Sequence, residues 1–221
     1  MIASIHQPAY LPWLGYFDKI SKSDVHIFFD DAQYSKNNLF NRNRIKTQIG
    51  ELWLTVPVRY KSGRSIHETE IDNSGNWREK HWKTITCNYS KTLFFKEYAG
   101  IFEEIYSRDW KILSDLTIAM NETICEIMGI KTKFYRSSEL KAEGMSNEKL
   151  INLCKTVGAD VYLSGQGAKV YMKEDLFREH GITVEYQEFS YPRYPQAWGD
   201  FIPNLSVIDY LFNCGVEEKY V

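Results

Sequence analysis

The chain has 221 residues, a formal net charge of −2 and an aromatic fraction of 15%, a length that allows one domain with a substantial core. A charge near zero without a basic tail argues against duplex nucleic acid as a partner. No window is long and apolar enough to cross a bilayer, so we expect a cytoplasmic protein without membrane insertion.

The beginning of the chain is its most constrained stretch. Ile2 to Ile5 predicts a buried strand, and a loop rich in proline and aromatic residues leads from it into a helix from about Tyr16 to Ser21. The prolines restrict φ, and Gly15 permits a conformation or a close approach that a side chain would block. In α/β proteins such a strand, turn and helix start commonly bind an anionic ligand, so we expect a site here.

A second strand is predicted at Asp24 to Phe29, which is rich in β-branched and aromatic residues. It ends in Asp30 and Asp31, and Gln33 follows. Acidic residues at the carboxyl end of a strand suit a metal or ribose site in α/β proteins. The alternative is a turn in which the aspartates cap their own backbone.

The segment Asn37 to Lys46 is polar and basic and has no amphipathic period. Arg42, Arg44 and Lys46 alternate there with asparagines, and a guanidinium suits phosphate or carboxylate oxygens. This segment is therefore an anion-binding candidate, with a solvated loop as the alternative. Leu52 to Val58 predicts another strand, with Ile66 to Ile71 as a possible hairpin partner.

The pattern then changes to helix from Trp77 to about Ile130, where apolar residues recur at helical spacing over perhaps three helices. We assign this helical block, residues 77–130, to packing. A strand is expected at Lys131 to Tyr135, and Ser146 opens a helix that Gly158 ends.

The last third of the chain is predicted to form an α/β crossover unit. After the helix that ends at Gly158 we expect a strand at Asp160 to Leu163, a loop at Ser164 to Gly167, a helix from Lys169 to His180 and a strand at Ile182 to Phe189. The two glycines of the loop would let backbone N–H groups approach an anion, although a tight turn explains them equally well. The chain is thus predicted to form a single α/β domain over residues 1–221, with an open, mostly parallel sheet, helices on both faces and the inserted helical block.

Residues 191–206 carry three prolines and four aromatic rings, which predicts an irregular segment that covers or lines a site or packs on the surface. Ser206 to Cys214 predicts a closing helix. The four cysteines are scattered without a C-x-x-C pair or clustered histidines, so we expect reduced thiols and no metal site.

An ordered set of short motifs resembles the WbqC-like family over essentially the whole chain. The motifs are His6-Gln7-Pro8, Tyr10-Leu11-Pro12-Trp13, Gly15-Tyr16-Phe17, Asp31 with Gln33-Tyr34, Arg42-Asn43-Arg44-Ile45-Lys46, Trp53 to Val58, Tyr162-Leu163-Ser164-Gly165 and Tyr194-Pro195-Gln196. Members of this family are encoded among bacterial O-antigen and surface-polysaccharide genes. The resemblance implies that pathway, with glycine transfer to a sugar as a reaction proposed for some members.

The first strand, the turn into a helix and the late Ser-Gly loop are also similar to nucleotidylyltransferase-type ATP enzymes, which implies a Rossmann-like fold. Those enzymes place H-x-G-H at the turn, whereas this chain has Leu14-Gly15-Tyr16 where the second histidine would lie. Basic residues at Lys19, Arg42, Arg44 or Lys46 could replace its charge. The sequence leaves open whether ATP acts as a cofactor here or the acyl group arrives already activated.

Our hypothesis from these residues is acyl or aminoacyl transfer to the amine of a nucleotide-linked amino sugar. The expected catalytic residues are His6 as general base or charge-stabilising donor, with Asp31 and Arg44. Substrate-binding candidates are Gln7, Tyr10, Trp13, Gly15, Tyr16, Lys19, Gln33, Arg42, Asn43, Lys46, Ser164, Gly165, Gln166, Gly167, Tyr194 and Gln196. The rings at 10, 13 and 16 would stack on substrate or, alternatively, pack in the core.

Three other functions remain open. An ATP-dependent adenylating enzyme would activate the amino-acid substrate itself. A non-catalytic subunit would bind a nucleotide sugar and present it to a partner enzyme of a polysaccharide pathway. A structural partner in such a pathway would carry an exposed apolar patch and no small-ligand pocket.

Overall fold

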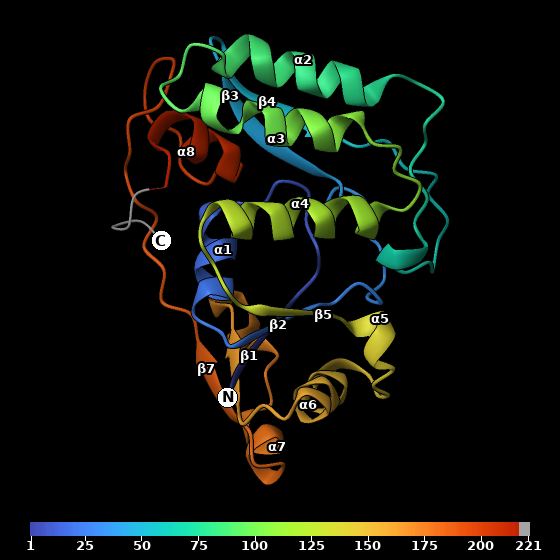
Figure 1. Ribbon diagram of the computed structural model, residues 1–221. Coiled ribbons are helices and arrows are strands. Elements are labelled where there is room, and N and C mark those ends of the chain that lie inside the picture. Colours follow the sequence, from blue (N-terminus) through green and yellow to red (C-terminus); the bar gives the residue numbers. More distant parts are fainter. Residues whose placement is uncertain (217–221) are drawn as a thin grey trace.

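A parallel sheet of five strands organises the chain in a computed structural model, which describes residues 1–216 (Figure 1). The strand order is β5-β2-β1-β6-β7, so the chain proceeds from β1 to one edge and then returns to the other side of β1. The strands are β1 (Ile2–His6), β2 (Val25–Phe28), β5 (Lys133–Arg136), β6 (Val161–Ser164) and β7 (Thr183–Tyr186). The predicted α/β class and the parallel sheet are confirmed, and the order reverses between β1 and β6.

Helices cover both faces of this sheet, as predicted. Ala3 and Ile5 of β1 join the core cluster under α6 and α7, while Ser4 and His6 point to the face covered by α1. The helices are α1 (Leu14–Ser21), α2 (Trp77–Tyr89), α3 (Phe95–Ser107), α4 (Leu113–Ile127), α5 (Ser137–Leu140), α6 (Ser146–Val157), α7 (Glu174–Glu179) and α8 (Val207–Cys214). Within residues 1–216, no helix is long and apolar enough to span a membrane.

A long insertion separates the adjacent strands β2 and β5. It contains the predicted helical block as the three helices α2, α3 and α4, and Figure 1 shows α4 lying across one side of the sheet. It also contains an antiparallel hairpin of β3 (Arg42–Thr47) and β4 (Gly50–Thr55), which pairs Arg44 with Trp53. One apolar core continues from α1 through this insertion to α8.

The hairpin corrects two expectations. The segment at 37–46 has regular structure from Arg42 onward, and β4 pairs with β3 rather than with Ile66 to Ile71. That second segment holds a short 3-10 helix, η1 (Ile66–Glu68), and only an isolated bridge joins Val58 to Ile71. The strand was hidden because the buried positions of β3 include polar residues as well as Ile45, so apolar alternation is absent.

The helix expected at Lys169 to His180 is also different. A 3-10 helix, η2 (Gln166–Val170), follows β6 directly, and α7 begins only at Glu174. Two acidic residues in the first turn of α7 favour this start, and the Lys173 N–H is bonded to the Asn147 side chain instead of continuing a helix.

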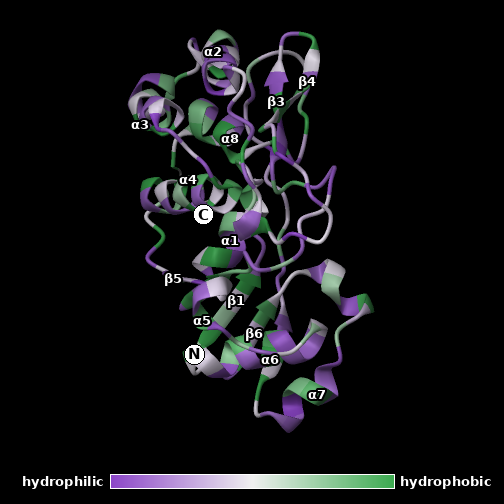
Figure 2. Cartoon of the chain, turned by 90° about the vertical axis from the view of Figure 1, so that its right-hand side faces the viewer, coloured by the Kyte–Doolittle hydropathy of each residue, from purple (hydrophilic) through white to green (hydrophobic). Residues whose placement is uncertain are grey.

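The segment at 191–206 is irregular, as predicted, and a buried polar network attaches it to the hairpin. Lys46 is 2% exposed, and its Nζ donates to Gln196 Oε1 at 3.0 Å and to the Asp200 carbonyl. Asp209 of α8 accepts from Tyr89 at 2.8 Å and from Tyr194 at 2.9 Å. Figure 2 shows the contrast between the apolar β1 and the hydrophilic residues of α7 at the outside of the molecule.

We predict that Lys46→Met lowers the free energy of unfolding by about 1–3 kcal/mol, because buried carbonyl and amide oxygens lose their donor. Urea denaturation measures this change, and Lys83→Met, at an exposed position of α2, is the matched control. Equal unfolding midpoints for the two variants would show that Lys46 does not hold the 191–206 segment.

Candidate functional site

A cavity of about 520 Å³ lies at the carboxyl ends of β1 and β6. This is the point at which the strand order reverses, where open α/β sheets bind their ligands. Its volume falls within the usual range for a small-molecule site, about 300–1,000 Å³. The lining residues are Ile5, His6, Gln7, Trp13, Gly15, Tyr16, Lys19, Phe29, Ser146, Asn147, Leu150, Tyr162, Ser164, Gly165, Gln166, Gly167, Ala168, Tyr171, Gln187 and Phe189.

The loop from β1 to α1 forms one wall and is held through its backbone. The Tyr10 N–H donates to the Leu39 carbonyl at 3.0 Å, Asn43 donates to the Leu11 carbonyl at 2.6 Å, and the Val207 N–H donates to the Pro12 carbonyl at 2.8 Å. Leu11 has a φ of 45°, a left-handed conformation that costs free energy in a branched residue. These bonds fix a strained loop in one shape, which places the ends of β1 and α1 against the cavity.

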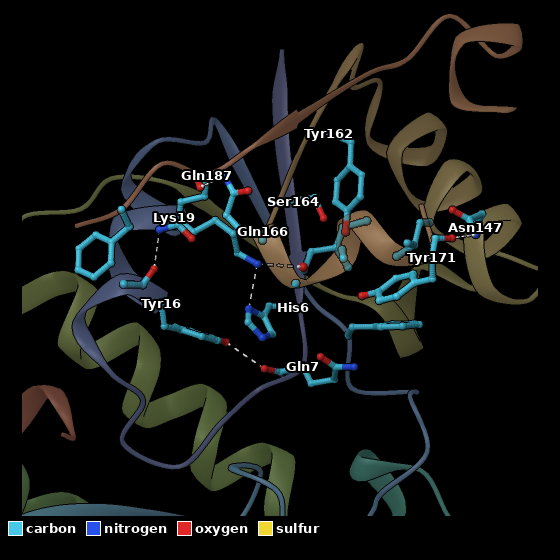
Figure 3. Close-up of a pocket in the computed structure, with 18 of the residues that line it drawn as sticks. His6, Gln7, Tyr16, Lys19, Asn147, Tyr162, Ser164, Gln166, Tyr171 and Gln187 are labelled. Carbon is cyan, nitrogen blue, oxygen red and sulfur yellow. Dashed lines mark hydrogen bonds between the residues drawn. The ribbon is translucent and has the colours of Figure 1, made fainter. Parts of the chain in front are cut away.

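His6 and Lys19 form the central polar pair of the cavity (Figure 3). Lys19 is 3% exposed, and its Nζ lies 2.8 Å from His6 Nδ1 and 3.3 Å from the Ile5 carbonyl oxygen. No carboxylate of residues 1–216 forms an ion pair with it. Burial therefore lowers the pKa of the Lys19 ammonium to about 7. Burial, and then the charge of Lys19, lower the pKa of His6 well below its usual value.

The proton on this pair decides what His6 can do. A charged Lys19 donates to Nδ1, which leaves the imidazole proton on Nε2 as a donor. A neutral Lys19 can accept from Nδ1–H, and Nε2 then carries a lone pair that can take a proton. Because the pKa of Lys19 is about 7, both forms occur near neutral pH.

Aromatic rings hold the imidazole in place. The Tyr16 ring centroid is 4.9 Å from that of His6, and the Trp13 centroid is 5.9 Å away. Tyr16 is 1% exposed and donates to the Gln7 carbonyl at 3.2 Å, and burial raises the pKa of its phenol. The structure thus places a neutral tyrosine beside the imidazole of His6.

Gly15 allows a close approach between this wall and the end of β7. A Cβ at Gly15 would lie 2.7 Å from the Phe189 ring and 2.9 Å from Trp13 Nε1. The Gln187 amide also donates to the Gly15 carbonyl at 2.7 Å and to Asp18 at 2.6 Å. Close approach, rather than an unusual φ, is the reason for glycine at this position.

The opposite wall comes from β6, η2 and the start of α6. Ser164 is 1% exposed at the end of β6, and Gln166 donates to the Gln187 carbonyl at 2.8 Å. Asn147 donates to the Tyr171 carbonyl at 3.2 Å and so joins α6 to the end of η2. Sequence reasoning placed the Ser164–Gly167 loop here but missed the residues from α6, the later part of η2 and the segment after β7. Gln187 lay inside the strand predicted at Ile182 to Phe189, so the sequence pattern carried no signal for it.

Asp31 and Gln33 lie outside the cavity. Asp31 forms an ion pair with Lys149 at 2.7 Å and accepts from Ser137, while Asp30 accepts from the N–H and hydroxyl of Ser138. Gln33 is exposed and makes an isolated bridge with Ser65. The carboxylates after β2 therefore hold the start of α5 and α6.

The basic segment at 37–46 does not line this cavity either. Arg42 lies over the Trp53 ring at 4.4 Å, and Arg44 pairs with Glu51 at 2.8 Å. Asn43 supports the β1–α1 loop, as described above, and Lys46 binds the 191–206 segment.

Three further candidates also point away from the cavity. The hydroxyl of Tyr10 meets His81 at 2.8 Å in the core, and Tyr194 and Gln196 belong to the network around Asp209 and Lys46. These side chains support the site from a distance.

A family model described as the WbqC-like protein family matches residues 7–221. The chain belongs to the WbqC-like family. An uncharacterized Mycobacterium tuberculosis protein, Rv1507c, is 39% identical over 218 residues, which cover 97% of this chain and 94% of that protein. No solved structure matches the chain.

The free energy of unfolding should depend on pH through the protonation of Lys19. Between pH 7 and 10.5 the unfolded chain keeps a proton on Lys19 that the folded protein has released, so stability rises with pH in this window. We predict that the free energy of unfolding of the native protein, relative to that of Lys19→Met, rises by about 1.4 kcal/mol per pH unit there. Denaturant unfolding at several pH values measures the difference. A difference that stays constant from pH 7 to 10 would contradict the lowered pKa.

Proposed function

We propose that this WbqC-like protein transfers an acyl or aminoacyl group to the amine of a nucleotide-linked amino sugar, in bacterial surface-polysaccharide (O-antigen) biosynthesis. The polysaccharide pathway comes from the family resemblance. The reaction type is the one that the resemblance implies, and one observation in the site supports it: Lys19 Nζ lies 2.8 Å from His6 Nδ1 at the wall of the cavity.

The cavity suits a nucleotide for three reasons. It lies at the reversal point of a doubly wound sheet. The aromatic rings of Tyr162, Tyr171 and Phe189 offer surfaces for a base or sugar. The first turns of α1 and α6 also border it, and helix N-termini favour phosphate oxygens.

The pair of His6 and Lys19 supplies the base for the transfer. With Lys19 neutral, Nε2 of His6 accepts a proton from the sugar amine as the amine nitrogen attacks the acyl carbon. The new N–C bond forms, and the bond from the acyl carbon to its leaving group breaks. The leaving group departs with the electron pair and takes the proton from His6, which restores the neutral pair.

Asp31 and Arg44 have no role in this mechanism, because each is engaged in an ion pair outside the cavity. Adenylation fits the site less well than acyl transfer does. The position expected for the second histidine of the similar ATP enzymes carries Tyr16, which is neutral. Lys19, the one lysine or arginine among the residues that line the cavity, has a pKa lowered to about 7, so it gives only a partial positive charge near a phosphate.

We predict that His6→Ala reduces amide formation by about 10²–10⁴-fold, the usual contribution of a general base. The assay mixes a UDP-amino sugar with a glycyl or acetyl thioester and measures the amide by mass spectrometry. His180→Ala, which replaces an exposed histidine after α7, is the matched control. Saturable binding of the UDP-amino sugar without turnover would instead favour a non-catalytic binding subunit, and the absence of binding would exclude a nucleotide-sugar site.

The pH profile gives a second, independent prediction. Because only neutral Lys19 leaves a lone pair on Nε2, kcat should rise with pH below about 7 and level off above it. In Lys19→Arg the pair stays charged at every pH tested, so the rise should disappear and activity should remain low. An unchanged profile in Lys19→Arg would remove Lys19 from the mechanism.

A further inference from the structure

A second, smaller cavity of about 260 Å³ adjoins the first one. Its lining residues are His6, Gln7, Ala9, Trp13, Asn38, Leu39 and Phe40. Three of these, His6, Gln7 and Trp13, also line the large cavity. The two cavities therefore meet at the end of β1 and along the β1–α1 loop. The volume is below the usual range for a whole ligand and suits a group of a few non-hydrogen atoms.

The walls of the small cavity are built and held together. Ala9 and Phe40 are buried, and the hydrogen bond from the Tyr10 N–H to the Leu39 carbonyl joins the β1–α1 loop to residues 38–40. Arg42 supports the neighbouring turn by donating to the Asn37 carbonyl at 2.8 Å. The fold itself therefore fixes the walls of the small cavity.

The lining also determines the charge of the occupant. None of the seven residues is acidic or basic except His6, which is neutral at physiological pH. The side-chain amide of Gln7 has no hydrogen-bond partner among residues 1–216, and Gln7 faces both cavities. A free amide N–H beside a neutral, partly apolar space suits a carbonyl group.

We propose that the small cavity binds the acyl group that is transferred, as a neutral carbonyl compound of few atoms, and that the Gln7 amide donates to its carbonyl oxygen. This assignment rests on the proposed function. In that reaction the sugar amine approaches His6 from the large cavity, and the acyl carbon that it attacks lies in the small cavity. Gln7 N–H stabilises the negative charge that develops on the carbonyl oxygen as the N–C bond forms. Leu39 limits the length of the acyl group.

Two fluorinated amides, trifluoroacetamide and pentafluoropropionamide, can probe the small cavity by ¹⁹F NMR titration, with and without saturating UDP. Both should bind in the presence of UDP, because UDP occupies only the large cavity. Leu39→Trp should weaken both by about tenfold or more, while Leu39→Ala should favour the longer amide, since one added carbon in a tight pocket changes affinity by at least about tenfold. Gln7→Glu keeps the shape and removes the donor, so it should also weaken binding.

Leu93→Trp is the matched control, because Leu93 is 81% exposed between α2 and α3. Melting temperatures establish that each variant is folded, and Leu39→Ala tests the same wall if Leu39→Trp does not fold. Any of three results would overturn the assignment: UDP abolishes amide binding, neither Leu39 variant changes the affinity for the amides, or the native protein shows no detectable amide binding. Failure of UDP to bind, with Leu39-dependent amide binding intact, would instead count against the proposed function.

Discussion

The burial of the Lys19 ammonium without a carboxylate is the constraint on which the site depends. A buried charge is costly unless it is compensated, and among residues 1–216 the compensation comes from His6 Nδ1 and the Ile5 carbonyl. Both acceptors belong to the end of β1, so α1 is held in one register against that strand. His26 of β2 packs against the Tyr16 ring, with centroids 5.9 Å apart, and burial together with the charge of Lys19 lowers its pKa as well. The site thus favours neutral imidazoles over additional cations.

Apart from Phe29, which directly follows β2, the insertion between β2 and β5 contributes to the site without lining the large cavity. Asn43 of the hairpin and Leu39 before it form hydrogen bonds with the backbone of the β1–α1 loop, and so does Val207 at the start of α8. A strained conformation such as that of Leu11 persists only when its surroundings determine it completely. Asn43, a substrate-binding candidate in the sequence, therefore acts on the site through the loop that it holds.

Much of the fold could be predicted from local patterns, and the exceptions have a common cause. The apolar run of β2 and the helical periods of α2 to α4 are local signals, and they were interpreted correctly. β3 was missed because Asn43 and Lys46 are polar and buried, and their partners lie 32 and 150 residues away in the chain. Such long-range bonds are invisible to a window of neighbouring residues. For the same reason the wall supplied by Asn147 and Gln187 could not be foreseen, whereas the wall from His6 to Lys19, which is contiguous in sequence, could.

The carboxylates after β2 are bonded to other protein groups, so the cavity has no acidic residue from this edge of the sheet to bind a ligand. Doubly wound folds often use an acidic residue at this edge to bind a ribose. Here Asp30 is bonded to Ser137 and Ser138, and Asp31 is paired with Lys149, so neither is free for a ligand. Recognition at the reversal point must then rely on rings, amides and the His6–Lys19 pair. The small cavity, whose lining has no acidic or basic residue except the neutral His6, has little affinity for an ionised amino acid, because the carboxylate would lose its hydration without a fixed countercharge. Under the proposed function, an acyl group that arrives already esterified or activated avoids this cost.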